Sequence, residues 1–197
     1  LADLDIGSSF APEFADQRVP NLRQVLELAK GKVGVFIELK YYGRQFNLEQ
    51  KVVRLVEEAG MASEVVIMSL NYDGLRRTAA LRPDWTYGLL NAVAIGDLTR
   101  LEVDFLALTA KATTVSMIRH AHKRGMRIYA WTIDDPVQMW VMMSRGVDGI
   151  ITDRVALANR VKELRAEVTP VGRFIVWIAG EVGLLRGVDE TSSEENA

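Results

Sequence analysis

The segment Gly34-Val35-Phe36-Ile37-Glu38-Leu39-Lys40 ends in an acid and a base two residues apart. Residues two apart on a β-strand point to the same face of the sheet. The apolar run from Val33 to Ile37 predicts a strand that is buried on both faces, as in parallel sheets. Because α/β enzymes place their chemistry at the carboxyl ends of such strands, we expect Glu38 and Lys40 to belong to an active site.

These two residue types suit phosphoryl chemistry. A hard cation such as Mg²⁺ or Ca²⁺ takes oxygen ligands, of which Glu38 can supply one, and Lys40 can balance the charge of a phosphate. The alternative is a structural ion pair with no part in catalysis. Trp131 ends another predicted strand, where its ring can wall a substrate pocket or fill the rim of the core.

Other polar residues have simpler interpretations. His120 and His122 lie two apart on a predicted helix, so they cannot form the i, i+4 ligand pair, and we expect both to be structural. Ser69 has no base beside it in the sequence, so we do not expect a nucleophile. We expect Asp153 to be a helix N-cap, and Asp5 either to cap a loop or to approach the site.

Composition narrows the function classes. A chain of 197 residues with 49% hydrophobic content can bury the core of one domain. A net charge of −2 gives no reason to expect nucleic acid as a partner. The lack of cysteine excludes disulfides, thiolate catalysis and zinc–thiolate sites. The first residues do not resemble a signal peptide, and the sequence leaves open whether the protein is cytoplasmic or membrane-associated.

Short apolar runs alternate with helical patterns along most of the chain, which predicts a parallel α/β sheet with crossover helices. A TIM-type (β/α)₈ barrel needs eight such units, and we expect it here without about its first two. An open doubly wound sheet is the alternative. The predicted strands lie at 34–40, 65–68, 85–90, 105–108, 127–132 and 147–152. Among the helices, we expect one to begin at Pro20, one to end at Gly60, a short one over 95–101, and one to end at Gly146.

The end of the chain departs from this alternation. An apolar stripe predicts an amphipathic terminal helix over 168–186, packed on the barrel or on a partner subunit; its residues are Val171, Phe174, Ile175, Ile178, Val182 and Leu185. The apolar run is too short to span a bilayer, but attachment to a membrane surface through 171–185 is an alternative. We expect a barrel over 1–167 and a disordered acidic tail over 187–197.

Six segments, in order, resemble the glycerophosphodiester phosphodiesterase family from about Leu4 to Asp153. Each segment alone is weakly specific, but their common order and spacing make the resemblance strong. They are Leu4-Asp5-Ile6-Gly7-Ser8-Ser9-Phe10, Val19-Pro20-Asn21-Leu22, Phe36-Ile37-Glu38-Leu39-Lys40, Ala121-His122 with Gly125, Ala130-Trp131-Thr132-Ile133, and Gly146-Val147-Asp148-Gly149-Ile150-Ile151-Thr152-Asp153.

The resemblance implies a phosphodiesterase barrel that uses a divalent metal, Mg²⁺ or Ca²⁺. Its substrates would be glycerophosphodiesters, hydrolysed to glycerol 3-phosphate and an alcohol. The family's metal-ligand glutamate falls on Glu38, its substrate- or phosphate-contacting lysine on Lys40, and its pocket-lining tryptophan on Trp131.

The family also has acid/base histidines in a His-Arg-Gly strand and a His-Asp element, and further metal carboxylates in a Glu-x-Asp strand. These elements precede the matched segments, and we assign none of them to this chain. We therefore assign no catalytic residue and expect the carboxyl-terminal part of a longer phosphodiesterase, itself nearly inactive. The alternative is a truncated, non-catalytic barrel that serves as a binding or assembly module. Its open strand edges would be covered by a second copy, by an amino-terminal half or by the terminal helix.

Overall fold

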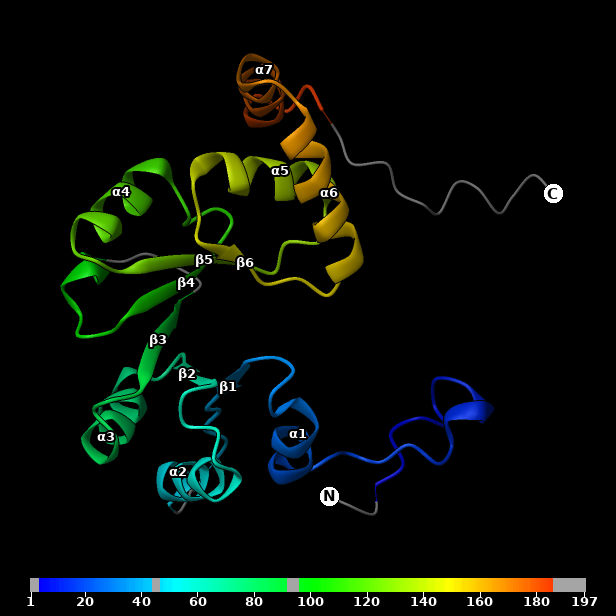
Figure 1. Ribbon diagram of the computed structural model, residues 1–197, viewed down its shortest axis with the longest axis vertical. Helices are drawn as coiled ribbons and strands as arrows, with labels where there is room; N and C mark the ends of the chain where they lie inside the picture. The colour runs from blue at the N-terminus through cyan, green and yellow to red at the C-terminus, as the bar shows by residue number, and fades with distance from the viewer. Residues whose placement is uncertain (1–3, 44–46, 92–95, 186–197) are drawn as a thin grey trace. The chain divides into compact units, whose positions relative to one another are not determined.

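The computed structural model describes residues 4–43, 47–91 and 96–185, in two compact units, Leu1–Gly88 and Leu89–Ala197 (Figure 1). Six strands form, as the sequence predicts, and they follow one another in chain order across the sheet. They are β1 (Val35–Glu38), β2 (Val65–Ser69), β3 (Thr86–Asn91), β4 (Phe105–Thr109), β5 (Arg127–Trp131) and β6 (Gly149–Ile150).

The first unit contains the strand that carries the acid and the base. β1 and β2 run parallel, in a register that pairs Val35 with Val65 and Glu38 with Met68. Parallel neighbours require a crossover connection, which the helix between them provides. The elements of this unit besides the strands are η1 (Pro12–Phe14), α1 (Leu22–Ala29), α2 (Leu48–Ala59) and α3 (Tyr72–Leu81).

Local sequence signals explain where these helices begin and end. The predicted start of α1 at Pro20 is slightly early, because Asn21 is the N-cap and forms a reciprocal capping box with Gln24. α2 ends at Gly60, as predicted, where φ is 66° and a residue without a side chain is favoured.

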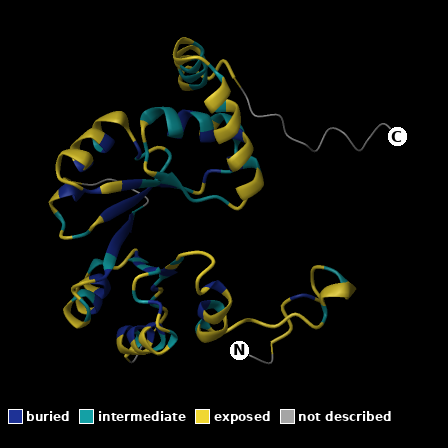
Figure 2. Cartoon of the chain, viewed as in Figure 1, coloured by how far each residue is buried: buried dark blue, intermediate teal, exposed yellow. Residues whose placement is uncertain are grey.

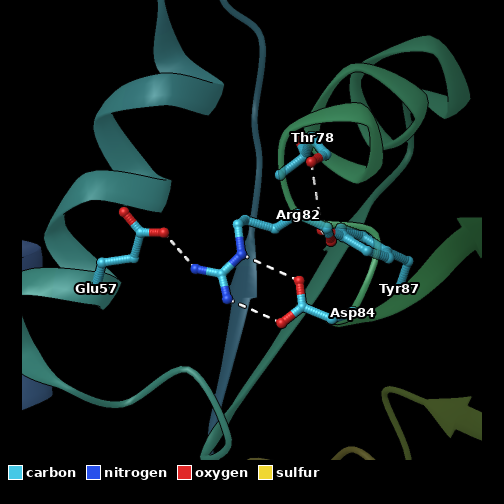
Figure 3. Close-up of polar contacts among 5 residues, drawn as sticks. All are labelled: Glu57, Thr78, Arg82, Asp84 and Tyr87. Carbon is cyan, nitrogen blue, oxygen red and sulfur yellow. Dashed lines mark hydrogen bonds and ion pairs between the residues drawn. The ribbon is translucent and has the colours of Figure 1, made fainter.

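An arginine holds together the end of α3 and its surroundings (Figure 3). The guanidinium of Arg82 donates to both carboxylate oxygens of Asp84, at 3.0 and 2.8 Å, and also to Glu57 on α2. It lies over the ring of Trp85, 5.0 Å from the centroid. The Arg82 carbonyl accepts a hydrogen bond of 2.6 Å from the Tyr87 hydroxyl, which joins this turn to β3.

In the second unit, β4, β5 and β6 are parallel neighbours. Figure 2 shows the strand β4 as almost entirely buried, while the helices expose their outer faces. A core cluster centred on Ile133 and Met139 packs α5 and α6 against the end of β5. The other elements of this unit are η2 (Leu98–Arg100), α4 (Val115–Lys123), α5 (Pro136–Arg145), α6 (Val155–Glu167) and α7 (Pro170–Glu181).

The predicted two-sided burial of the first strand is wrong. Only Ile37 is buried in β1, whereas Phe36 is 43% exposed and Val33 lies outside the strand, 63% exposed. The reason is that β1 stands at the end of the strand order, with β2 as its one neighbour in the described sheet. A terminal strand is covered less completely than an interior one.

Three further predictions need correction. Asp153 does not cap α6, because Arg154 occupies the N-cap position without a side-chain cap, and the Asp153 amide instead donates to Asp134 at 2.9 Å. The helix expected over 95–101 is only the short η2, and residue 95 lies outside the described residues. The last strand is β6 alone, shorter than the predicted 147–152.

A helix forms within the predicted 168–186 as the shorter α7, and the apolar stripe, of which Val182 and Leu185 lie beyond its end, stays largely exposed. Every residue of the stripe is at least partly exposed, and none of α7 is fully buried. α7 instead contacts α5 through another face, where Arg145 pairs with Glu181 at 2.6 Å and Gly180 approaches Val141. Within the described ranges, no helix is long and apolar enough to cross a bilayer. The expected tail, 187–197, lies outside them.

Candidate active site

The side chains of Glu38 and Lys40 lie side by side at the carboxyl end of β1. The Lys40 ammonium is 3.3 Å from Oε2 of Glu38, and the two side chains are 54% and 26% exposed, respectively. The two-residue spacing accounts for this arrangement, since Glu38 ends the strand and Lys40 follows it. Both charged groups can therefore be reached from solvent at the carboxyl end of a parallel strand.

Leu39, the residue between Glu38 and Lys40, forms hydrogen bonds through both its amide and its carbonyl. Leu39 is buried, and its amide donates to the Met68 carbonyl at 2.8 Å. Its carbonyl accepts a hydrogen bond of 2.7 Å from the hydroxyl of Ser69, which is fully buried and also accepts from the Asn71 amide at 3.0 Å. These contacts give Ser69 a structural role.

The residue after Lys40 belongs to a second polar cluster. The hydroxyl of Tyr41 donates to Oε1 of Glu49, at 3.0 Å, and the same oxygen accepts from Nε of Arg77 at 2.7 Å. The Arg77 guanidinium also lies over the Tyr41 ring, 5.5 Å from its centroid. Glu49 is buried in the first turn of α2, so its charge depends on these two partners.

The pKa values in this cluster reflect those contacts. Burial alone would raise the pKa of the Glu49 carboxyl, but hydrogen bonds from its own backbone, from Arg77 and from Tyr41 outweigh burial and lower it. Burial, and next the hydrogen bond to Glu49, raise the pKa of the Tyr41 hydroxyl. Glu49 is thus a carboxylate, and Tyr41 a neutral donor, at neutral pH.

Trp131, the third residue expected in the site, is the last residue of β5 and belongs to the second unit. Its side chain is partly buried, and its indole N–H donates to the Ala107 carbonyl at 2.8 Å. This bond joins neighbouring strands of one sheet and fixes the orientation of the ring. Trp131 is thus held at the carboxyl end of its strand.

The histidines make local contacts. Nε2 of His122 lies 2.8 Å from Oδ2 of Asp148, which also accepts from the Ile128 amide, and Nδ1 of His120 lies 2.9 Å from the Ser116 carbonyl. Both contacts fit the predicted structural roles.

Asp5 accepts from the amides of Gly7 and Ser8 at 2.9 Å each, so it caps a loop, which was one of its two expected roles.

The described residues contain no cluster that could hold a metal ion by itself. Among residues 4–43, 47–91 and 96–185, no three or more histidines, aspartates or glutamates are grouped so that they could hold a metal ion. Hard divalent cations need several oxygen ligands. Glu38 has a partly exposed carboxylate, which could supply one oxygen ligand.

The sequence profile of the glycerophosphoryl diester phosphodiesterase family matches residues 1–157. The chain belongs to this family. A glycerophosphodiester phosphodiesterase of Caldanaerobacter subterraneus is 31% identical over 168 residues, which cover 78% of this chain and 65% of that protein. The family membership predicted from six short segments is therefore confirmed.

Solved structures of the family share the fold. A glycerophosphodiester phosphodiesterase from Parabacteroides distasonis is 25% identical, with a TM-score of 0.70 over 76% of this chain and 66% of that one. A phosphodiesterase from Oleispira antarctica, in complex with its product sn-glycerol-3-phosphate, is 21% identical, with a TM-score of 0.70 over 83% and 69%.

The fold is thus that of a phosphodiesterase TIM-type barrel without about its first two βα units, and not an open doubly wound sheet. The chain spans about two thirds of the length of the curated relatives that it matches, between 64% and 66% for three of them. These comparisons do not favour the non-catalytic module, and they give no support to the expected self-association or membrane attachment.

Sequence reasoning missed the cluster of Tyr41, Glu49 and Arg77. A signal for it was present, because Glu49 stands three, four and seven residues before Val52, Val53 and Val56, on the buried stripe of α2. A carboxylate on an apolar helical stripe is expected to have a buried partner.

Proposed function

We propose that the protein to which this chain belongs hydrolyses glycerophosphodiesters to glycerol 3-phosphate and an alcohol, with Mg²⁺ or Ca²⁺ as cofactor. The observation that carries the proposal is the Glu38–Lys40 pair at the carboxyl end of β1, in a chain of the phosphodiesterase family. The bound sn-glycerol-3-phosphate in the Oleispira antarctica phosphodiesterase supports a substrate of this class.

In this proposal, Lys40 binds a phosphate oxygen. Its ammonium carries three donors, and at 54% exposure it is accessible to an anion while it stays beside Glu38. Glu38 would hold the divalent cation, which when bound stabilises negative charge that develops on the phosphate oxygens. Trp131, whose ring is fixed through its indole N–H, would line the substrate pocket with an apolar surface.

We further propose that residues 1–167 form the barrel portion and 168–186 a terminal helix. We assign no residue of the barrel portion as the acid or base, since His120 contacts the Ser116 carbonyl on α4 and His122 contacts the carboxylate of Asp148, which lies before β6. Hydrolysis needs a group that protonates the leaving alcohol. We therefore expect the 197-residue chain alone to show little or no turnover and to bind the metal weakly.

The experiment is a measurement of glycerol 3-phosphate release by the full-length natural polypeptide that contains this chain. We expect Glu38→Gln and Lys40→Met each to lower kcat/KM by about 100-fold, equivalent to about 2.7 kcal/mol of transition-state stabilisation. The matched controls are Glu27→Gln and Lys32→Met, since both residues are exposed in the same unit. Activities of all four variants within threefold of the parent would refute the assignment.

A further inference from the structure

The geometry points to Tyr41 as a positioning residue for Lys40, held in place by Glu49 and Arg77. Its importance for turnover rests on the proposed function, but its effect on the location of Lys40 does not. Tyr41 touches neither substrate nor metal in this proposal. It acts on the reaction only through the backbone of the residue before it.

Lys40 cannot fix the position of its own ammonium. A lysine side chain has several rotatable bonds, and its ordering costs conformational entropy. Its ion pair with Glu38 spans 3.3 Å between partly exposed groups, and such pairs contribute little. The position of the Lys40 backbone therefore decides which points in space the ammonium reaches.

The backbone of Lys40 is anchored on both sides, by different means. On the amino-terminal side, Leu39 is held by the Met68 carbonyl and by the buried hydroxyl of Ser69. On the carboxyl-terminal side, the anchor is the Tyr41 side chain, hydrogen-bonded to Glu49. The second anchor therefore depends on a side chain.

The protein leaves a space of defined size for the Tyr41 ring. Gly74 is buried in the first turn of α3, and a Cβ added there would lie 2.2 Å from the Tyr41 hydroxyl and 2.6 Å from two ring carbons. Arg77, one turn later on α3, covers the ring and shares Oε1 of Glu49 with the hydroxyl. α2 and α3 thus fix Tyr41 together.

Two variants disturb the anchor in different ways. Tyr41→Phe removes the hydroxyl and keeps the ring. Gly74→Ala keeps the hydroxyl but forces the ring to move, while alanine itself favours the helix that it enters. Tyr42→Phe is the control, since it removes a hydroxyl from the next residue, which is 74% exposed.

The measurement is an NMR experiment on the full-length natural polypeptide, whose lysines carry ¹³C-labelled dimethyl groups. This modification keeps the charge of the lysines. The Lys40 methyl resonance is identified by its loss in Lys40→Arg. Without ligand, we expect Tyr41→Phe and Gly74→Ala to shift or broaden this resonance, and Tyr42→Phe to leave it unchanged. On titration with glycerol 3-phosphate, we expect the two variants to bind about three- to tenfold more weakly, as for the loss of one hydrogen bond.

Different results would refute the positioning role of Tyr41 and the phosphate contact of Lys40. If the Lys40 resonance without ligand is the same in the parent, Tyr41→Phe and Gly74→Ala, the positioning role is refuted, even if both variants unfold at a lower temperature. If instead glycerol 3-phosphate fails to move the Lys40 resonance of the parent, the proposed phosphate contact is refuted. The positioning role is then judged on the ligand-free spectra alone. Should Tyr41→Phe not fold, Glu49→Gln, which keeps the shape of the partner, takes its place.

Discussion

Replacement of Ser69 by alanine tests how the segment between Glu38 and Lys40 is held. The hydroxyl is fully buried, donates to the Leu39 carbonyl at 2.7 Å and accepts from the Asn71 amide at 3.0 Å. The variant leaves both backbone groups without this partner. Each hydrogen bond contributes about 0.5–1.5 kcal/mol net, so we expect the free energy of unfolding to fall by about 1–3 kcal/mol.

Urea denaturation measures this loss. For a slope of about 2 kcal/mol per molar urea, the midpoint should fall by roughly 0.5–1.5 M with the slope unchanged. Hydrogen exchange of the Asn71 amide should become faster, since this N–H loses its acceptor. Ser116→Ala is the control, because this serine is exposed and its hydroxyl lies 3.4 Å from His120, so the expected change is within about 0.5 kcal/mol. Equal midpoints for the two variants would show that the Ser69 hydroxyl does not hold Leu39.

Three other predictions concern charged groups. The pKa of the Glu49 carboxyl is lower in the folded protein than its ordinary value of 4.5. The stability that this carboxylate contributes is therefore fully present above that ordinary value and is lost as the pH falls through the folded pKa. The urea midpoint of Glu49→Gln should therefore decline less than that of the parent between pH 6 and 3. Hydrogen bonds from the Ser8 hydroxyl and from nearby backbone amides lower the pKa of Asp5 to about 2, and the carboxyl ¹³C shift should therefore stay unchanged down to about pH 3. Arg145→Ala removes both bonds to Glu181, at 2.6 Å each, and should speed limited proteolysis around α7; an unchanged cleavage rate would mean that the pair does not hold this helix.

The sequence was most informative where one residue type determines the backbone. Gly60 ends α2 and Gly146 ends α5, both with positive φ, and both ends were predicted from glycine alone. The six strands were likewise predicted from the alternation of short apolar runs with helical patterns. Asp153 shows the opposite case. Its side chain is of a type that often caps helices, and it lies just before α6. Its amide instead donates to Asp134, and Arg154 occupies the N-cap position.

Other features depended on contacts distant in sequence. Phe36 has the residue type of a buried strand, but its exposure depends on the place of β1 at the end of the strand order, which periodicity does not reveal. The pairing of Tyr41 with Glu49 and Arg77 joins three segments, of which only the buried position of Glu49 leaves a trace in the pattern of α2. Both cases are properties of the assembled sheet and helices, not of a local window.

The surroundings of Glu38 and Lys40 argue against the alternative of a structural ion pair. A partly exposed pair at 3.3 Å contributes at most about 1 kcal/mol to stability, so stability alone gives little reason to keep it. Yet the residues on either side are held by a buried hydroxyl, Ser69, and a buried carboxylate, Glu49, both of which cost free energy unless fully hydrogen-bonded. Buried polar groups that fix the backbone around an accessible acid and base are typical of a site whose geometry serves binding. These surroundings therefore support the proposal that the pair serves binding and not stability.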